Sequence, residues 1–479
     1  MSGSELLNGL TPYPHSIHRA EGCTVFMAKA EAGDKLVVLG ENPGFSGREE
    51  RGADQTVLIA DLDHENAQAL RRLFPFTAPR QGLKGGCSMG VGDRLGIATP
   101  GHLRVFERWP QVFPVLAQQS IRELTLTGRT YEDVLDPVTF AVFREGFHGG
   151  FGADGDHLKK PEEIEYALRC GYSMITLDSS EHIRNDVKDM DETSLAAAYR
   201  ADEALEARYL GKDFDIGLNK PLRYTKPDLM RANLIYGESI KFIKEIFERH
   251  ISGNPLDFEI SIDETATPTL PLEHFFVASE LTRAGVRFVS LAPRFCGEFQ
   301  KGVDYIGNLA QFEHELAAHH AIAKHFGYKL SVHSGSDKFS VFPAVGRVTE
   351  GVFHIKTAGT NWLEAVRLVA LKAPGLYRLM HRFALEKFSE ASKYYHVTAN
   401  LDNIPDINTL SDAELPPLMD QNDARQLLHI TYGLILTAKN ADGSYRFKDD
   451  LYALWAEYAK EYEALLEKHI GRHLEMLLG

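Results

Sequence analysis

Residues 258–292, FEISIDETATPTLPLEHFFVASELTRAGVRFVSLA, carry the clearest structural signal in the chain. Two short apolar runs, FEISID (258–263) and RFVSLA (287–292), enclose a longer stretch with helical periodicity, PLEHFFVASELTRAG (271–285). The longer stretch begins with Pro and ends in Gly, as helices often do. This order predicts a strand, a helix and a second strand of a parallel sheet.

The same alternation begins near Gly85 and continues for most of the chain. Each apolar run ends in a polar or glycine-rich cluster. We count eight candidate strands: RLGIAT (94–99), FPVLAQ (113–118), EGFHGGFGA (145–153), SMITLD (173–178), FEISID (258–263), RFVSLA (287–292), KLSVH (329–333) and VFHIK (352–356). Eight βα units predict an α/β fold, a TIM-like (β/α)8 barrel with its active site at the carboxyl ends of the strands. An open doubly wound sheet is the alternative.

Three parts are expected along the chain. Residues 1–84 alternate short apolar runs with turn signals, which predicts a small N-terminal β-rich cap. Residues 85–373 are expected to form the barrel, with a helical insertion at 182–254 over its mouth. Residues 374–479 are again helical in pattern and predict a C-terminal helical extension.

Composition describes an ordinary globular protein. The 479 residues are 44% hydrophobic and 25% charged, and 52 Lys and Arg against 67 Asp and Glu give a net charge of −15. An acidic surface repels phosphate backbones and anionic headgroups, so neither a nucleic acid nor a membrane partner is expected. The sequence shows no apolar leader, and its four cysteines form no CxxC pair. We therefore expect a cytoplasmic protein.

Polar residues follow the predicted strands, and a barrel brings such positions together in one bowl. They include Asp178, Asp263, Glu264, His333 and His354. Imidazole and carboxylate together suit Zn, Mn, Ni, Co or Fe, whereas Mg and Ca prefer oxygen ligands alone. We therefore expect a divalent metal ion as cofactor. Ordinary hydrogen-bonded groups at strand ends are the alternative interpretation.

Two glycine-rich segments do not fit nucleotide sites. GFGADG (150–155) matches G-x-G-x-x-G, but the next predicted helix starts only at Pro161, and two aspartates occupy the place that a pyrophosphate needs. No nicotinamide cofactor is therefore expected. GGCSMGVGDRLG (85–96) has another glycine spacing and is expected to be a flexible or ligand-contacting loop before the first strand.

Several longer strings resemble the tagaturonate/fructuronate epimerase family of hexuronate catabolism. They are GDRLGIATPGH (92–102), FHGGFGADGDHLK (147–159), ITLDSS (175–180), SIDET (261–265), VHSGSDKF (332–339) and HIKTAGTNW (354–362). The resemblance implies a metal-dependent barrel enzyme that inverts C4 of a keto-hexuronate, so the expected partner is a small sugar acid.

The chemistry of that reaction explains the need for a metal. In a 2-ketose the C4 hydrogen is not adjacent to the carbonyl, so a base cannot remove it to give a stabilised enolate. A retro-aldol step avoids this: the C4 hydroxyl loses its proton, the C3–C4 bond breaks, the aldehyde turns and the bond re-forms. A metal near the C2 and C3 oxygens would stabilise the enediolate as a Lewis acid.

Individual residues are assigned to roles on expected geometry. Glu264, His333 and His354 are the predicted metal ligands, with Asp263 as the rival to Glu264, and Asp178 is the predicted general base. The predicted substrate-binding residues are Lys159, His157, Arg294, Ser334, Lys356 and Gln119. Strand-end ion pairs are the alternative for each lysine and arginine.

Two other functions stay open at this point. A metal-dependent ketose isomerase or 3-epimerase would use the same metal site but move a proton between adjacent carbons. A non-catalytic sugar-acid-binding protein would bind hexuronates without converting them.

Overall fold

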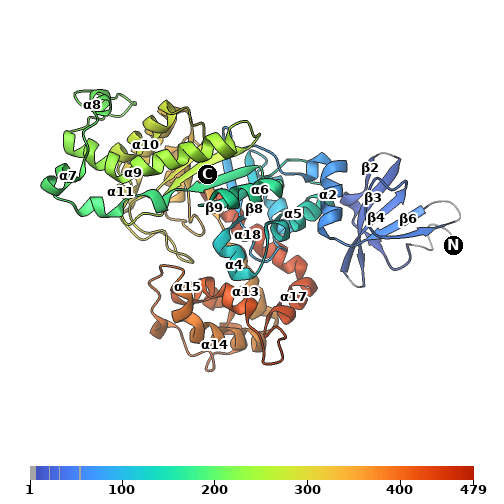
Figure 1. The fold of residues 1–479 in the computed structure, drawn as a ribbon. Coiled ribbons are helices and arrows are strands. Elements are labelled where there is room, and N and C mark those ends of the chain that lie inside the picture. Colours follow the sequence, from blue (N-terminus) through green and yellow to red (C-terminus); the bar gives the residue numbers. More distant parts are fainter. Residues whose placement is uncertain (1–6, 21, 32, 53–55) are drawn as a thin grey trace.

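The computed structural model describes residues 7–20, 22–31, 33–52 and 56–479. Its centre is a closed barrel of eight strands (Figure 1), which are β7 (Cys87–Val91), β8 (Val112–Ser120), β9 (Gly152–Leu158), β10 (Met174–Asp178), β11 (Asp257–Ile262), β12 (Ser290–Pro293), β13 (Lys329–Val332) and β14 (Phe353–Thr357). Every pair of neighbours is parallel, and β14 pairs with β7 to close the barrel. The predicted TIM-like barrel is confirmed, and the open sheet is excluded.

Helices follow the strands and surround the barrel. They are α3 (Thr99–Arg108), α4 (Ile121–Thr127), α5 (Tyr131–Glu145), α6 (Pro161–Arg169), α9 (Lys226–Ile246), α10 (Pro271–Arg283), α11 (Leu309–Phe326), α12 (Phe342–Val348) and α13 (Thr360–Lys372). Helix α10 and strands β11 and β12 form the strand–helix–strand unit expected from residues 258–292. No helix in the described part of the chain is long and apolar enough to cross a bilayer.

Two of the predicted strands were wrong in position. The first strand is Cys87–Val91, inside the segment expected to be a loop, and Thr99 already begins α3. The third strand is Gly152–Leu158, shifted toward the aspartates of GFGADGD, not 145–153. Glycine and aspartate have low strand propensity, but here both strands are held by neighbours on each side in a closed barrel, and this context overrides propensity.

The N-terminal region forms its own antiparallel sheet. Its strands are β1 (Thr11–Pro12), β2 (His18–Ala20), β3 (Cys23–Ala30), β4 (Gly33–Gly40), β5 (Arg48–Arg51) and β6 (Thr56–Ala60). Together with α2 (His64–Leu73) it encloses a small core that meets Phe140 and Phe143 of α5. The β-rich character predicted for this region is confirmed, although residues 1–6, 21, 32 and 53–55 of the predicted cap lie outside the described residues.

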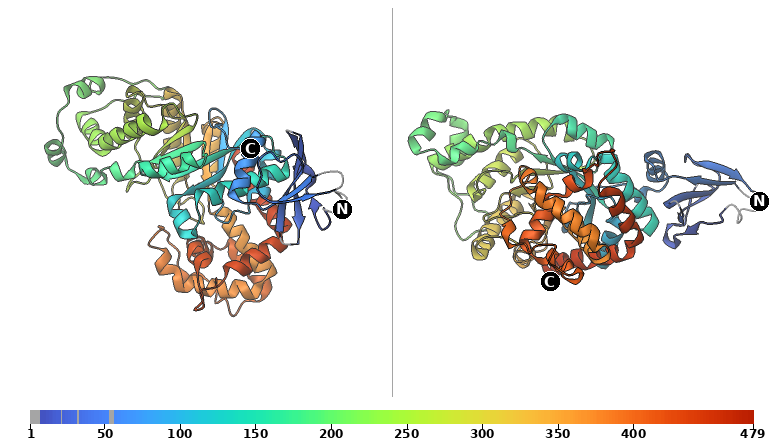
Figure 2. Two further views of the ribbon diagram at one scale, coloured as in Figure 1. Left: turned by 45° about the vertical axis from the view of Figure 1, so that its right-hand side comes forward. Right: turned by 90° about the horizontal axis from the view of Figure 1, so that it is seen from below.

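Residues 182–254 and 374–479 extend from the barrel in different directions (Figures 1 and 2). The first contains α7 (Glu192–Ala198), α8 (Glu203–Tyr209) and α9, which packs against α10. The second contains α14 (Pro374–Ala391), α15 (Asn422–Ile430), α16 (Tyr432–Thr437), α17 (Lys448–Glu457) and α18 (Ala459–Leu478). In both figures α7 and α8 lie on the side of the barrel away from the N-terminal sheet. The division at residues 84 and 373 stays a prediction.

Candidate active site

A cavity of about 370 Å³ opens at the carboxyl ends of the barrel strands. Its polar wall is formed largely by residues that end the strands or follow them: Gln118, Ser120, Asp156, His157, Asp263, Glu264, Arg294, Lys301, His333, Ser334 and Lys356. Tyr394, Tyr395 and His396 of the C-terminal region complete the wall. Among the described residues, none from 182–254 lines this cavity, so the C-terminal region covers the mouth where we expected the insertion.

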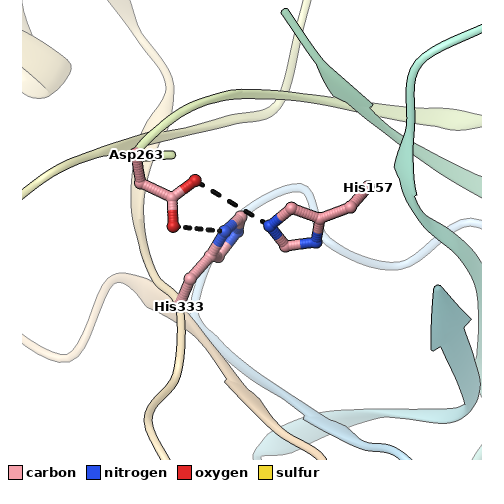
Figure 3. A group of neighbouring side chains, drawn as sticks. All are labelled: His157, Asp263 and His333. Carbon is pink, nitrogen blue, oxygen red and sulfur yellow. Dashed lines mark ion pairs between the residues drawn. The ribbon is translucent and has the colours of Figure 1, made fainter. Parts of the chain in front are cut away.

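Three potential metal ligands meet in the cavity, namely His157, Asp263 and His333 (Figure 3). Nδ1 of His333 lies 3.2 Å from Oδ2 of Asp263, and Nε2 of His157 lies 3.8 Å from Oδ1 of the same carboxylate. One donor atom from each residue lies within 4.8 Å of the other two. These distances are short enough for one small cation to contact all three.

Each imidazole of this group is oriented by a second carboxylate. Asp156 Oδ1 lies 2.8 Å from Nδ1 of His157, and Glu259 Oε1 lies 2.8 Å from Nε2 of His333. A carboxylate on the far nitrogen fixes the tautomer and turns the other nitrogen toward the ligand. In agreement, Nδ1 of His333 is buried and has Asp263 Oδ2 as its neighbour at 3.2 Å. This nitrogen therefore faces the other two potential ligands.

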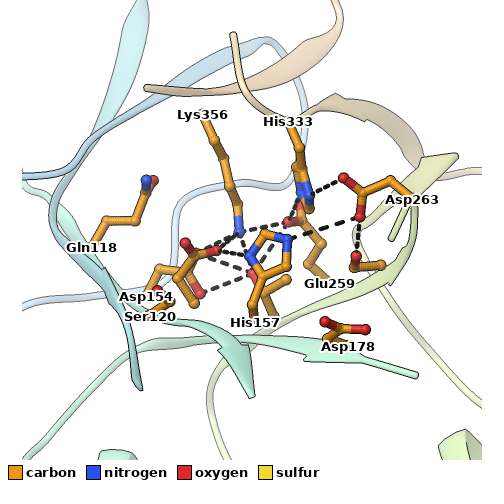
Figure 4. Close-up of polar contacts among 12 residues, drawn as sticks. Gln118, Ser120, Asp154, His157, Asp178, Glu259, Asp263, His333 and Lys356 are labelled. Atoms are coloured by element: carbon orange, nitrogen blue, oxygen red, sulfur yellow. Dashed lines mark hydrogen bonds and ion pairs between the residues drawn. The ribbon is translucent and has the colours of Figure 1, made fainter. Parts of the chain in front are cut away.

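A buried lysine lies beside the imidazoles (Figure 4). The ammonium of Lys356 is 2.7 Å from Asp154, 2.7 Å from Asp156 and 2.8 Å from Glu259. With Asp263, these acids bring four carboxylates to a site with one ammonium. The excess of negative charge favours a divalent cation in addition to the lysine.

The electrostatics of the two histidines agree with that charge excess. Although burial favours the neutral form, Asp156 and Asp263 raise the pKa of His157 well above its usual value. Burial likewise opposes charge on His333, but Asp263 and Glu259 raise its pKa. Both imidazoles thus attract positive charge, which a proton or a metal ion supplies.

Backbone strain is concentrated at the same place. His157 has φ 55° and Ser334, the residue after His333, has φ 51°. Left-handed conformations are uncommon outside glycine and cost free energy of order 1–3 kcal/mol each. Strain of this kind persists where the surrounding contacts over-determine the geometry, as the carboxylates around both imidazoles do here.

The predicted ligands Glu264 and His354 lie beside this group and not in it. Glu264 lines the cavity, where Arg122 binds it at 3.0 Å and Lys159 lies 3.6 Å away. His354 is fully buried on β14, and its Nδ1 is 2.9 Å from Ser88 Oγ. Neither residue belongs to a set of three potential ligands among the described residues.

The predicted base Asp178 ends β10 and is 1% exposed. Oδ1 accepts the Ser180 N–H at 2.8 Å, and Oδ2 lies 3.3 Å from Nζ of Lys159. Burial raises the pKa of this carboxyl. Lys159 therefore joins Asp178 to Glu264, and Figure 4 shows Asp178 next to the histidine group.

Some of the predicted substrate-binding residues line the cavity, and the others do not. His157, Arg294, Ser334 and Lys356 line it. Lys159 and Gln119 are absent from the wall in the described part of the chain, and Gln118 takes the expected place of Gln119 because successive strand residues face opposite sides. The roles of these residues stay predictions.

A second set of potential ligands consists of Asp337, which follows β13, and of His469 and His473 on α18. Its ring nitrogens already have partners: His469 contacts Asp337 through Nε2 and Glu364 through Nδ1, and His473 Nε2 accepts the Asp337 N–H at 3.0 Å. This set is an ion-pair network that joins the C-terminal region to the barrel.

Sequence reasoning missed Glu259 and Lys301. Glu259 lies inside the apolar run FEISID, where an acidic residue on a buried strand was the available signal. Lys301 lies in the loop after β12, nine residues beyond the predicted strand end, and nothing in its local pattern marks it.

Comparison with known proteins agrees with the barrel and its site. A family model described as tagaturonate epimerase matches residues 13–477. A Thermotoga maritima protein named tagaturonate/fructuronate epimerase is 41% identical over 479 residues, covering 98% of each chain. The native structure of a fructuronate-tagaturonate epimerase from Cohnella laeviribosi has a TM-score of 0.95 at 52% identity, covering 98% of this chain and 97% of that one. A complex of the Cohnella protein with one glycerol gives the same TM-score and identity, covering 99% and 98%.

Proposed function

Because the chain belongs to the tagaturonate epimerase family, we propose that it interconverts D-fructuronate and D-tagaturonate by inverting C4 through a metal-assisted retro-aldol reaction. It is an epimerase, and therefore an enzyme of the isomerase class. Family membership does not favour the ketose isomerase, the 3-epimerase or the non-catalytic binding protein. The observation that carries the metal-assisted mechanism is the three-donor group in the cavity.

The proposed metal ligands are His157, Asp263 and His333, in place of the set predicted from sequence. Two imidazoles and one carboxylate suit a first-row divalent ion. Such an ion would supply Lewis-acid stabilisation to negative charge that develops on the C2 and C3 oxygens. Asp156 and Glu259 hold the two rings in place, and Lys356 limits the repulsion among the acids.

The reaction begins when a carboxylate takes the proton of the C4 hydroxyl. As the C4 carbonyl forms, the C3–C4 bond breaks and its electron pair moves to C3, giving an enediolate and an aldehyde. The aldehyde turns about the C4–C5 bond, C3 attacks its other face, and the carboxylic acid returns the proton. No atom is gained or lost, and no oxidant is needed.

Two carboxylates are candidates for the base, and Lys159 joins them. Asp178 is the first, because its raised pKa favours accepting a proton. Glu264 is the second, because it lines the cavity. In Asp178→Asn we expect kcat/KM to fall roughly 100-fold or more and its acid limb against pH to disappear. If Glu264→Gln has that effect and Asp178→Asn does not, Glu264 is the base.

Metal dependence is tested by exhaustive chelation followed by addition of single divalent ions. We expect turnover to vanish and to return with one or more of Zn, Mn, Ni, Co or Fe, while elemental analysis reports about one bound ion per chain. Full activity in metal-free protein would exclude the Lewis-acid proposal.

The retro-aldol route is tested in heavy water. The original hydrogen stays on C4 in this mechanism, so the product should contain no deuterium at C4. Deuterium at C4 would exclude the route, and deuterium at C1 or C3 would indicate an isomerase or a 3-epimerase.

A further inference from the structure

Three lysines line the cavity, and in two of them the ammonium group uses all its hydrogen-bond donors within the protein. Lys356 is surrounded by carboxylates. Lys338 donates to three backbone carbonyls, those of Gln300 at 2.9 Å, Val303 at 2.6 Å and Ser336 at 2.9 Å. An ammonium has three donors, so neither lysine has one left for a ligand.

Lys301 differs from the other two. Its ammonium donates one hydrogen bond, to Ser334 Oγ at 3.1 Å. No carboxylate among the described residues forms an ion pair with it, although the side chain is half-buried and burial lowers the pKa of this lysine. A partly desolvated ammonium without a counter-ion is costly, and an anion in the cavity removes that cost.

The ammonium contacts the residue that follows a proposed metal ligand. Ser334 directly follows His333, one of the proposed metal ligands, and both line the cavity. The left-handed backbone at Ser334 (φ 51°) sets the direction of its side chain. The lysine therefore faces the same space as the metal ligands.

The loop that carries Lys301 is anchored to the C-terminal region. Gln300 Oε1 accepts hydrogen bonds from the N–H and hydroxyl of Thr398, at 3.0 and 2.9 Å, and from Gln426 Nε2 at 2.9 Å. Gln426 Nε2 also donates to the Lys301 carbonyl at 3.2 Å. A pre-positioned cation loses little conformational entropy when it binds an anion.

The geometry points to Lys301 as the residue that binds the substrate carboxylate and selects sugar acids over neutral ketoses, an inference that rests on the proposed function. An ammonium and a carboxylate form a charge-assisted hydrogen bond, which a C6 alcohol cannot match. Moreover, the carboxylate belongs to the C4–C6 fragment that breaks away in the retro-aldol step. Lys301 then retains this fragment while its aldehyde group turns.

Arg294 is the rival cation. It lines the cavity, and no carboxylate among the described residues pairs with it. However, its guanidinium makes no hydrogen bond within the described part of the chain, and only its backbone is fixed: Thr269 Oγ1 accepts the Arg294 N–H at 3.1 Å and the Thr269 N–H donates to the Arg294 carbonyl at 2.8 Å. Lys301 is positioned by a side-chain contact and Arg294 is not, which favours Lys301.

The test compares two sugars that differ only at C6, D-fructuronate and D-fructose, by calorimetric binding and by kcat/KM on the metal-loaded protein. In Lys301→Met and Lys301→Gln we expect affinity and kcat/KM for the uronate to fall roughly 100-fold. Values for fructose should change less than about threefold, because fructose has no carboxylate to lose. Lys301→Arg should keep much of the uronate preference, and Lys324→Met, an exposed lysine on α11, should leave both sugars unaffected.

Three results would overturn the assignment: uronate binding that survives in both uncharged variants, equal losses for the two sugars, or a selective loss in Arg294→Met instead. Thermal unfolding of each variant shows whether it is folded. If the wild-type protein binds D-fructuronate without epimerising it, the proposed function fails, and the affinity comparison still decides the role of Lys301.

Discussion

The barrel buries a lysine near each of its ends, and the two are held in opposite ways. Lys356, near the carboxyl ends of the strands, contacts three carboxylates that raise its pKa despite burial. Lys329, at the amino ends, donates to Ser88 Oγ at 2.8 Å and to the Gly86 carbonyl at 3.2 Å, and burial lowers its pKa to about 8. Charge is concentrated at one end, and at the other end the ammonium of Lys329 is held by neutral groups, with no ion pair to an acid among the described residues.

The end of the barrel with more charged groups does not have the larger cavity. The amino ends border a larger cavity, about 670 Å³, whose wall includes Phe247, Phe258, Phe288 and Tyr328. The carboxyl ends border the smaller one, about 370 Å³, with the histidines and acids. Neither set of three potential ligands among the described residues lines the larger cavity. The arrangement of donor atoms, and not the volume, marks the end that performs chemistry.

The largest expected effect comes from removing a ligand at the carboxyl end. His333→Ala should lower kcat/KM on the order of 1000-fold, because Lewis-acid stabilisation is lost with the metal. Elemental analysis should show a matching loss of bound ion. His320→Ala, on the wall of the larger cavity, is the matched control and should keep both metal and activity. Equal metal content in the two variants would contradict the assignment.

The two lysines should differ in their contribution to folding. Lys356→Met leaves its carboxylates without a counter-ion and should lower the free energy of unfolding by about 3–5 kcal/mol. Lys329→Met removes an ammonium that has no acid partner and should cost about 1 kcal/mol or less. Denaturant unfolding at neutral pH measures both. Similar losses would show that the two ends are electrostatically equivalent.

The contributions of Lys329 and Lys356 to stability should change with pH in opposite directions. The pKa of Lys329 is about 8 in the folded chain against 10.5 for an unperturbed lysine. Between these values the unfolded state binds more protons, so this group makes stability rise with pH, by about 3 kcal/mol in all. The wild-type protein should therefore gain stability relative to Lys329→Met from pH 8 to 10.5. For Lys356, whose pKa is raised, stability is fully present below 10.5 and is lost above it.

The smallest expected effect is on metal affinity, and it is measured by replacing two acids of the same strand, β11. Glu259 orients His333, so Glu259→Gln should weaken metal affinity about 10–100-fold. Asp257, at the amino end, accepts the N–H groups of Gly82 and Leu83 at 2.8 and 2.9 Å. Asp257→Asn should leave metal affinity unchanged and alter only stability. Competition with a metal indicator measures both, and a metal defect in Asp257→Asn would refute the contrast.

Sequence periodicity predicts the positions of the apolar strands correctly, and it fails for the strands that contain glycine and acidic residues. SMITLD and FEISID match β10 and β11 within one residue at either end. The segment around Cys87 was expected to be a loop, and the strand that contains Asp154 was placed too early, at 145–153, since the strand character of both comes from neighbouring strands and not from local composition.

The candidate site could be predicted in kind but not in detail. Strand ends pointed to the loops that carry His333, His157 and Asp263. Asp263 and Glu264 both follow β11 and both line the cavity, but only Asp263 reaches the two histidines, and the sequence does not show which of two neighbouring acids does so. Lys301 and the C-terminal wall depend on long-range packing, which no local pattern reports.

The anchoring of Gln300 by Thr398 and Gln426 also bears on how the enzyme is made. A ribosome completes the last barrel strand at Thr357 before it adds either of these residues. A nascent chain can therefore contain every proposed metal ligand before the hydrogen bonds that hold the Lys301 loop can form. If the proposed mechanism holds, the chain gains the ability to cleave the C3–C4 bond and retain both fragments only after the C-terminal region has docked.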